Sequence, residues 1–157
     1  MRPSLLVCSL LIASAMPARA DWTVTSQRDR LTDKDRKTAS LPAARPDHGV
    51  TARLVISCLE DRLVGGLILA IETSAVFTRG RMGLRFRVDE QEPEARFMPV
   101  NAHGTGMEQW ADPDDLRGAR RLRVELQPAR SPNLFYDFDL TGVDKALAAV
   151  PCTRTRS

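Results

Sequence analysis

Short runs in which apolar and polar residues alternate recur along this chain of 157 residues and constrain its fold most strongly. In the run Arg53–Leu59, the side chains of Leu54, Ile56 and Cys58 share one face, as in a β-strand with one buried side. The same period of two recurs in segments 84–88, 121–127 and 134–140. About seven or eight such strands, spaced roughly ten residues apart, predict a mainly β domain built as an antiparallel sandwich or barrel.

The segments between these runs complete the predicted sheet. Leu67–Val76 is apolar on both faces at first, as a central strand is. Four shorter strands are predicted, at residues 22–25, 38–41, 95–98 and 107–110. Three connections are predicted as well: a charged turn at 27–37, a loop at 41–49, and a turn or bulge at 65–66.

The pattern changes to a helical period near the C-terminus. In Gly142–Val150, the apolar residues Val143, Leu147 and Val150 fall on one side, and Pro151 ends the helix. Thr141 and Asp144 are predicted as its capping pair. A single helical turn is also predicted at 112–116, because Asp112 is followed by proline at the first helical position and then by two acidic residues.

The first twenty residues have the pattern of a secretory signal peptide. Arg2 precedes the apolar run Leu5–Ala15, and Ala18-Arg19-Ala20 forms an A-x-A cleavage site. That run is too short to span a hydrocarbon core of about 30 Å, and no later run is longer. We therefore expect a signal peptide at 1–20, one β-sandwich domain at 21–152, a flexible tail at 153–157, periplasmic localisation and no membrane insertion after cleavage.

Cysteine content agrees with export. Of the three cysteines, Cys8 lies inside the signal sequence, which leaves Cys58 and Cys152. Two cysteines in an exported chain predict one disulfide, and free buried thiols are the alternative. Such a bond joins the end of the C-terminal helix to the strand that carries Cys58.

The charge balance argues against a nucleic-acid-binding function. The whole chain has 23 Lys and Arg against 20 Asp and Glu, a formal charge of +3. Without Arg2 and Arg19, 21 basic residues remain against 20 acidic ones. Nucleic-acid binders usually show a strongly basic surface, so no nucleic-acid partner is predicted.

The sequence shows no recognisable catalytic or metal-binding constellation. The two histidines, His48 and His103, each precede a glycine, and the motifs of serine hydrolases and zinc peptidases do not occur. Asp29, Asp33 and Asp35 lack the spacing of a calcium loop and indicate a solvated turn instead. We predict no enzyme activity, no metal and no cofactor.

Arginines repeat on the polar face of two predicted strands. Arg85 and Arg87 alternate with apolar residues in one strand, and Arg121 and Arg123 do so in another. If the strands are neighbours, the four guanidinium groups form a basic patch that binds a carboxylate or phosphate partner in forked geometry. The alternative is a solvated face on which Asp89, Glu94 and Glu125 neutralise the arginines.

Four segments follow one another along the chain: Ser26–Asp33 after a tryptophan-led strand, Leu54–Cys58, Arg87–Asp89, and Phe138–Gly142 followed by a short helix and Cys152. Together, and in this order, they resemble the VasI/TagO-type periplasmic proteins associated with type VI secretion. The resemblance implies a small exported β-rich accessory protein without known catalytic residues. It implies that the protein acts by protein–protein interaction with envelope or secretion-system proteins.

Other functions remain open beside this one. The chain is also compatible with an inhibitor or immunity-like module that inserts a basic loop into an enzyme's cleft. A weaker resemblance is to the invasion-associated locus B family, which is also small, exported and β-rich. A cell-wall hydrolase is a third possibility. We expect a monomer or a weak oligomer.

Overall fold

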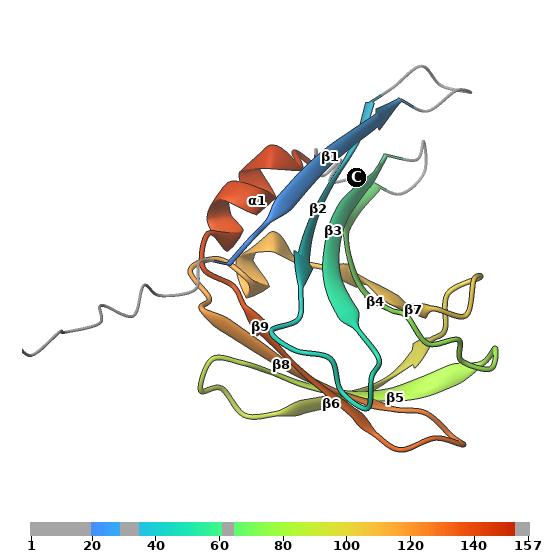
Figure 1. The fold of residues 1–157 in the computed structure, drawn as a ribbon. Helices are drawn as coiled ribbons and strands as arrows, with labels where there is room; N and C mark the ends of the chain where they lie inside the picture. Colours follow the sequence, from blue (N-terminus) through green and yellow to red (C-terminus); the bar gives the residue numbers. More distant parts are fainter. Residues whose placement is uncertain (1–19, 29–34, 61–64, 153–157) are drawn as a thin grey trace, which may run out of the picture.

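Two antiparallel sheets form the fold (Figure 1). The computed structural model describes residues 20–28, 35–60 and 65–152, so the predicted tail and nearly all of the predicted signal peptide lie outside it. In chain order the elements are β1 (Thr23–Arg28), β2 (Asp35–Pro42), β3 (Ala52–Glu60), β4 (Gly65–Thr73), β5 (Arg81–Val88), β6 (Glu94–Pro99), β7 (Gly106–Ala111), the 3-10 helix η1 (Pro113–Asp115), β8 (Arg121–Gln127), β9 (Leu134–Asp139) and α1 (Val143–Ala149).

The strand order confirms the predicted antiparallel β-sandwich with a short C-terminal helix. One sheet has the order β1-β2-β3-β4-β7, and the other has the order β6-β5-β8-β9. The alternation in the sequence sets the register between β5 and β8, where Leu84 lies opposite Leu126 and Phe86 opposite Val124. Both apolar rows therefore point into the space between the sheets.

The core lies between the two inner faces. Its fully buried centre includes Leu54 and Ile56 from β3, Leu126 from β8 and Phe138 from β9, each with no exposed surface. Burial of such side chains stabilises the fold by about 1.5–3 kcal/mol each, so this layer supplies much of the driving force for folding.

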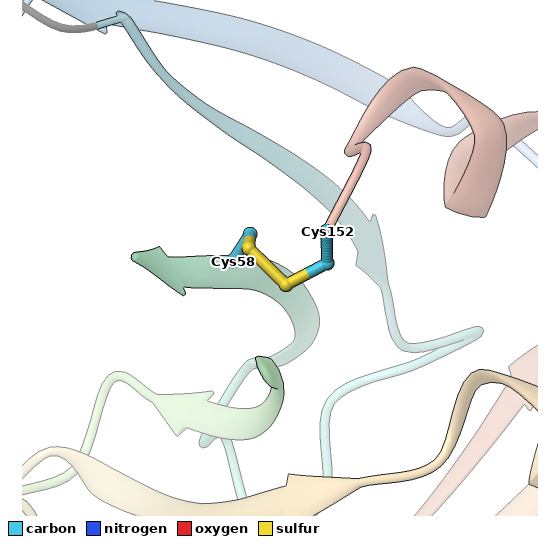
Figure 2. Close-up of a disulfide and its surroundings, with 2 residues drawn as sticks. All are labelled: Cys58 and Cys152. Atoms are coloured by element: carbon cyan, nitrogen blue, oxygen red, sulfur yellow. A yellow bond between two sulfur atoms is a disulfide. The ribbon is translucent and has the colours of Figure 1, made fainter. Parts of the chain in front are cut away.

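The helix α1 covers one end of the sandwich beside β1 and β2 (Figure 1). Val143 and Ala146 of α1 are buried in the core, as is Val150 at its C-cap. The chain leaving α1 reaches Cys152, whose sulfur is bonded to Cys58 of β3, with 5.4 Å between the two Cα atoms (Figure 2). The predicted disulfide is thus confirmed, and it fastens the end of α1 to the sheet.

The predicted capping pair of α1 is wrong. The residue at the N-cap is Gly142 with φ 85°, and no side chain caps the helix. The Thr141 hydroxyl and amide instead donate backwards to the Asp139 carboxylate, at 2.6 and 3.0 Å. Asp144 accepts from the Gly118 amide at 3.2 Å. A left-handed glycine turns the chain sharply here, which takes the Thr141 side chain away from the helix amides.

Two connections also differ from the prediction. β1 and β2 extend into the predicted charged turn, since Gln27 pairs with Arg36 and Arg28 with Asp35. The Asp29 and Asp33 of that turn lie outside the described residues. Residues 65–66, predicted as a turn or bulge, are the first two residues of β4 and pair with residues 60 and 59 of β3. Glycine weakens a strand without preventing backbone pairing, so pairing with β3 keeps these two residues in the strand.

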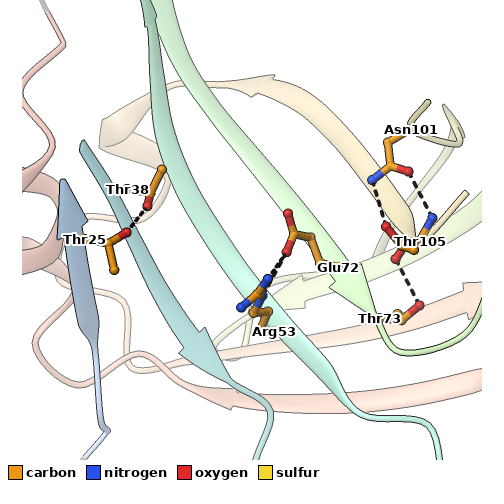
Figure 3. Close-up of polar contacts among 7 residues, drawn as sticks. All are labelled: Thr25, Thr38, Arg53, Glu72, Thr73, Asn101 and Thr105. Atoms are coloured by element: carbon orange, nitrogen blue, oxygen red, sulfur yellow. Dashed lines mark hydrogen bonds and ion pairs between the residues drawn. The ribbon is translucent and has the colours of Figure 1, made fainter. Parts of the chain in front are cut away.

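A hydrogen-bonded turn leads from the second sheet back to the first. Asn101 accepts from the Thr105 amide at 3.0 Å, and the Thr73 hydroxyl donates to the Thr105 carbonyl at 3.0 Å (Figure 3). Gly106 then begins β7 so close to β4 that a Cβ there would lie 2.1 Å from the Ile71 carbonyl oxygen. The turn therefore fixes where β7 joins the sheet and how it diverges from β6.

Candidate functional site

The four arginines singled out in the sequence lie on one face. β5 and β8 are direct neighbours, with Arg87 opposite Arg123 and Arg85 opposite Glu125. All four point away from the core, because the intervening residues of both strands line it. We call the outward side of β6-β5-β8-β9 the outer arginine face.

Each of these arginines has an acidic neighbour. Arg85 pairs with Glu125 at 2.9 Å, Arg87 with Glu90 at 3.5 Å, and Arg123 with Asp137 at 3.3 Å. Arg121 interacts electrostatically with Asp139. These pairs reduce the repulsion between Arg87 and Arg123 on neighbouring strands. The face is therefore close to charge balance, and an anionic partner for it stays a prediction.

Glu125 is the best-anchored carboxylate on this face. Its oxygens accept from Gln127 at 3.1 Å, Asn133 at 2.8 Å and Arg85 at 2.9 Å, and its side chain is 14% exposed. The hydrogen bond from Gln127, followed by those from Asn133 and the charge of Arg85, holds the pKa of Glu125 below its usual range.

Two exposed phenylalanines border the outer arginine face. Phe97 on β6 is 68% exposed, and Phe135 on β9 is 58% exposed. Phe97 lies opposite Gly83, and Phe135 lies opposite Glu125, so both rings project on the same side as the arginines. They stand on the two edge strands, separated by three strand spacings, or about 14 Å. Single exposed apolar residues are ordinary, but two aromatic rings flanking arginines resemble the composition of protein interfaces.

Other residues of the quoted motifs have structural roles. The Asp89 carboxylate accepts from the Arg121 amide at 2.8 Å and from the Arg120 amide at 3.0 Å. Asp89 has φ 47°, a left-handed conformation that aspartate tolerates better than most residues. It ties the end of β5 to the start of β8. Asp139 does the same for the turn into α1, and the hydrogen bonds from Thr141 lower its pKa.

A cleft of about 420 Å³ lies between the inner faces of the two sheets. It opens between β6 and β7 and is closed at one end by the loop that contains η1. Its apolar wall consists of Leu69, Ile71, Leu84, Phe86, Val88, Met98, Met107, Leu116, Leu122 and Val124. We call it the inter-sheet cleft. Its volume lies in the range typical of ligand sites, about 300–1,000 Å³.

The lining of the inter-sheet cleft contains more acidic than basic residues. Asp89, Glu92, Glu94, Glu108, Asp114 and Asp115 line it against two arginines, Arg96 and Arg117. The side chain of Glu108 points to the outer face of its sheet, and the Asp89 carboxylate is held by the Arg120 and Arg121 amides. Arg96 pairs with Glu94 at 2.6 Å, and its guanidinium lies 5.2 Å from the centre of the Phe86 ring. Arg117 pairs with Asp114 at 2.7 Å. The carboxylates outnumber the cations even after these pairs.

Sequence reasoning did not find this cleft. Its wall comes from five strands and from the loop after η1, and only their placement in space brings the residues together. One signal was present: Glu94 and Arg96 share a side of β6 with Met98, and that side faces inward. Charged residues on the inner side of a strand mark a sheet edge that the core does not cover completely.

In the described part of the chain, no three side chains of His, Cys, Asp or Glu gather into a potential metal site. None of its helices has the length and apolarity needed to cross a bilayer. No protein-family model, curated protein or solved structure matches the chain. Fold and surface therefore define it only as a disulfide-bonded antiparallel β-sandwich with an open edge.

Proposed function

We propose that this protein is an exported, non-enzymatic binding protein of the periplasm that acts as an accessory factor of type VI secretion. The proposal rests on the ordered sequence resemblance, and the Cys58–Cys152 disulfide is compatible with an oxidising compartment. The partner is an envelope or secretion-system protein.

The observation that carries the binding function is the pair of exposed phenylalanines on the outer arginine face. Phe97 and Phe135 are the largest exposed apolar side chains of the second sheet. Arg85 lies in the register row of Phe135, one row away from that of Phe97. Aromatic residues and arginine dominate the binding energy of protein interfaces. The balanced charge of this face suits a partner surface with mixed charges better than a polyanion.

Site-specific photo-crosslinking in cells tests the binding face. A photoreactive phenylalanine analogue is placed at position 97 or 135, and at position 76 as the control, because Val76 is 77% exposed but lies outside both sheets. We expect the same envelope protein to be crosslinked from 97 and 135 and not from 76. Equal crosslinking from all three positions would contradict the assignment of the face.

A secretion assay tests the type VI role separately. Deletion of the gene is expected to lower export of a type VI tube protein, and the parent gene restores it. The variant with Phe97→Ser and Phe135→Ser should restore export poorly, whereas Val76→Ser should restore it fully. Loss of two aromatic anchors typically weakens an interface at least about tenfold. Unchanged export in the deletion strain would refute the secretion role.

A further inference from the structure

The opening of the inter-sheet cleft lies between two unpaired strand edges. β6 is the last strand of one sheet and β7 the last strand of the other. Val100 and Met107 form a single bridge between the two segments, and no other pairing joins them within the described residues. Each strand therefore presents backbone N–H and C=O groups along its outer edge, of which the Phe97 carbonyl of β6 already accepts a hydrogen bond from the Arg81 side chain. Such an edge can accept an added strand through its remaining groups.

Beneath these edges the core is incompletely covered. Leu69, Phe86, Val88 and Met98 pack against the buried core, yet each retains exposed surface. They come from β4 of one sheet and from β5 and β6 of the other, and all four line the cleft. An extended chain laid along the mouth points every second side chain into the cleft, because side chains of a strand alternate between its two faces.

The negative charge at the mouth favours basic residues at the two ends of such a segment. Glu92 and Asp115 are exposed, line the cleft, and make no side-chain hydrogen bond or ion pair with the described residues. With Glu94 and Asp114 beside them, the mouth carries an excess of negative charge. Lysine or arginine in the incoming segment complements that excess, whereas an acidic segment is repelled.

We propose that the inter-sheet cleft binds an extended, basic-flanked peptide segment of a partner protein, which pairs as an additional strand with the free edge of β6. Alternate apolar side chains of the segment enter the cleft beside Met98 of β6, and its flanking cations face Glu92 and Asp115. This site is on the opposite side of β6 from the ring of Phe97. It is therefore a second binding surface, independent of the outer arginine face.

Methionine methyl groups provide a test without substitution. Met98 and Met107 line the cleft, whereas Met82 is buried in the core outside it. The probe is a short peptide in which valine alternates with threonine between paired lysines. On titration of the purified oxidised chain, the ¹³C-methyl signals of Met98 and Met107 should shift and saturate, while the signal of Met82 stays in place.

Two control peptides separate the elements of the proposal. In the first, proline replaces each threonine, which removes backbone donors and prevents ladder pairing. In the second, glutamate replaces each lysine. Neither should shift the Met98 and Met107 signals at concentrations that saturate the parent peptide. If the proline peptide binds as well as the parent, strand pairing is overturned; if the glutamate peptide does so, charge selection is overturned.

A matched pair of variants locates the charge effect. Glu92→Gln with Asp115→Asn removes two charges at the mouth, and Asp21→Asn with Glu72→Gln removes two charges elsewhere. Exposed ion pairs contribute about 0.5 kcal/mol each, so the first variant should bind the labelled parent peptide about fivefold more weakly at low salt. The second should bind like the parent protein. Equal loss in both variants refutes the site.

Two further results would overturn the peptide-binding proposal, one from the methionine signals and one from the oligomeric state of the free chain. Absence of a saturable shift at Met98 and Met107 overturns the proposal, as does a shift confined to Met82. If the free chain is a dimer in light scattering and the peptide does not dissociate it, a second copy occupies the cleft and the partner-peptide assignment is wrong.

Discussion

Removal of the disulfide gives the most quantitative test of the fold. The bond between Cys58 and Cys152 joins residues 94 positions apart. A cross-link that closes a loop of this length restricts the unfolded chain and stabilises the folded state by about 4–5 kcal/mol. Domains of this size are typically stable by about 5–15 kcal/mol, so the variant Cys58→Ala/Cys152→Ala should lose a large share of its stability.

Urea denaturation followed by far-ultraviolet circular dichroism measures that loss. With a slope of about 2 kcal/mol/M, the midpoint of the variant should fall by about 2 M, and the slope should rise because the unfolded chain expands. A reducing agent should bring the parent protein to the midpoint of the variant and leave the variant unchanged. A variant within about 1 kcal/mol of the oxidised parent would refute the loop-entropy reasoning.

Three further outcomes follow from single residues. Burial, assisted by the Asp47 charge, raises the pKa of Tyr136 to about 12 from 10.0. Because Tyr136 is the one tyrosine of the chain, absorbance at 295 nm should titrate near pH 12 in the folded protein and near pH 10 in urea. The free energy of unfolding should fall as the pH rises above 10, because the tyrosine of the unfolded chain ionises first. The pKa of Glu125 is lowered by its hydrogen bonds, so its stabilising contribution is present above the unfolded pKa and lost as the pH falls below it. Thermal melts of Glu125→Gln should therefore show a weaker acid dependence than those of the parent. Gly106→Ala should lower stability in urea by roughly 1–3 kcal/mol or more, because the new Cβ meets the Ile71 carbonyl; an unchanged midpoint would show that β7 can move away from β4.

The strands with one buried face were predictable because burial and alternation coincide in them. β8 begins and ends where its pattern does, at Arg121 and Gln127, and its apolar residues are all buried. The turn at η1 was also predicted correctly: Asp112 accepts from the Asp114 amide at 3.1 Å, and proline begins the turn. In these segments the local chemistry and the tertiary environment favour the same structure.

The lengths of β1 and β2 were underestimated for the opposite reason. Every residue of β1 is exposed, so no hydrophobic period marks the strand. Backbone pairing and contacts such as the 2.6 Å hydrogen bond between the Thr25 and Thr38 hydroxyls define it instead (Figure 3). Such pairing depends on which strand lies alongside, and a single sequence does not contain that information.

The candidate surfaces were predictable to different degrees. The common face of Arg85, Arg87, Arg121 and Arg123 followed from parity alone, whereas the pairing of Arg123 with Asp137 required the position of β9. The inter-sheet cleft could not be predicted from the sequence, because it depends on how far β6 and β7 separate on moving away from the Val100–Met107 bridge.

The order in which the chain visits its two sheets has a consequence for how the protein unfolds. The chain leaves the first sheet after β4, builds β5 and β6 in the second, returns for β7, and then crosses again to β8 and β9. The first sheet is completed by β7, which follows β5 and β6 of the second sheet in the sequence. The second sheet is completed by β8 and β9, which follow β7 of the first. No cut through the chain yields a self-sufficient half, and denaturation should proceed as a single cooperative transition rather than layer by layer.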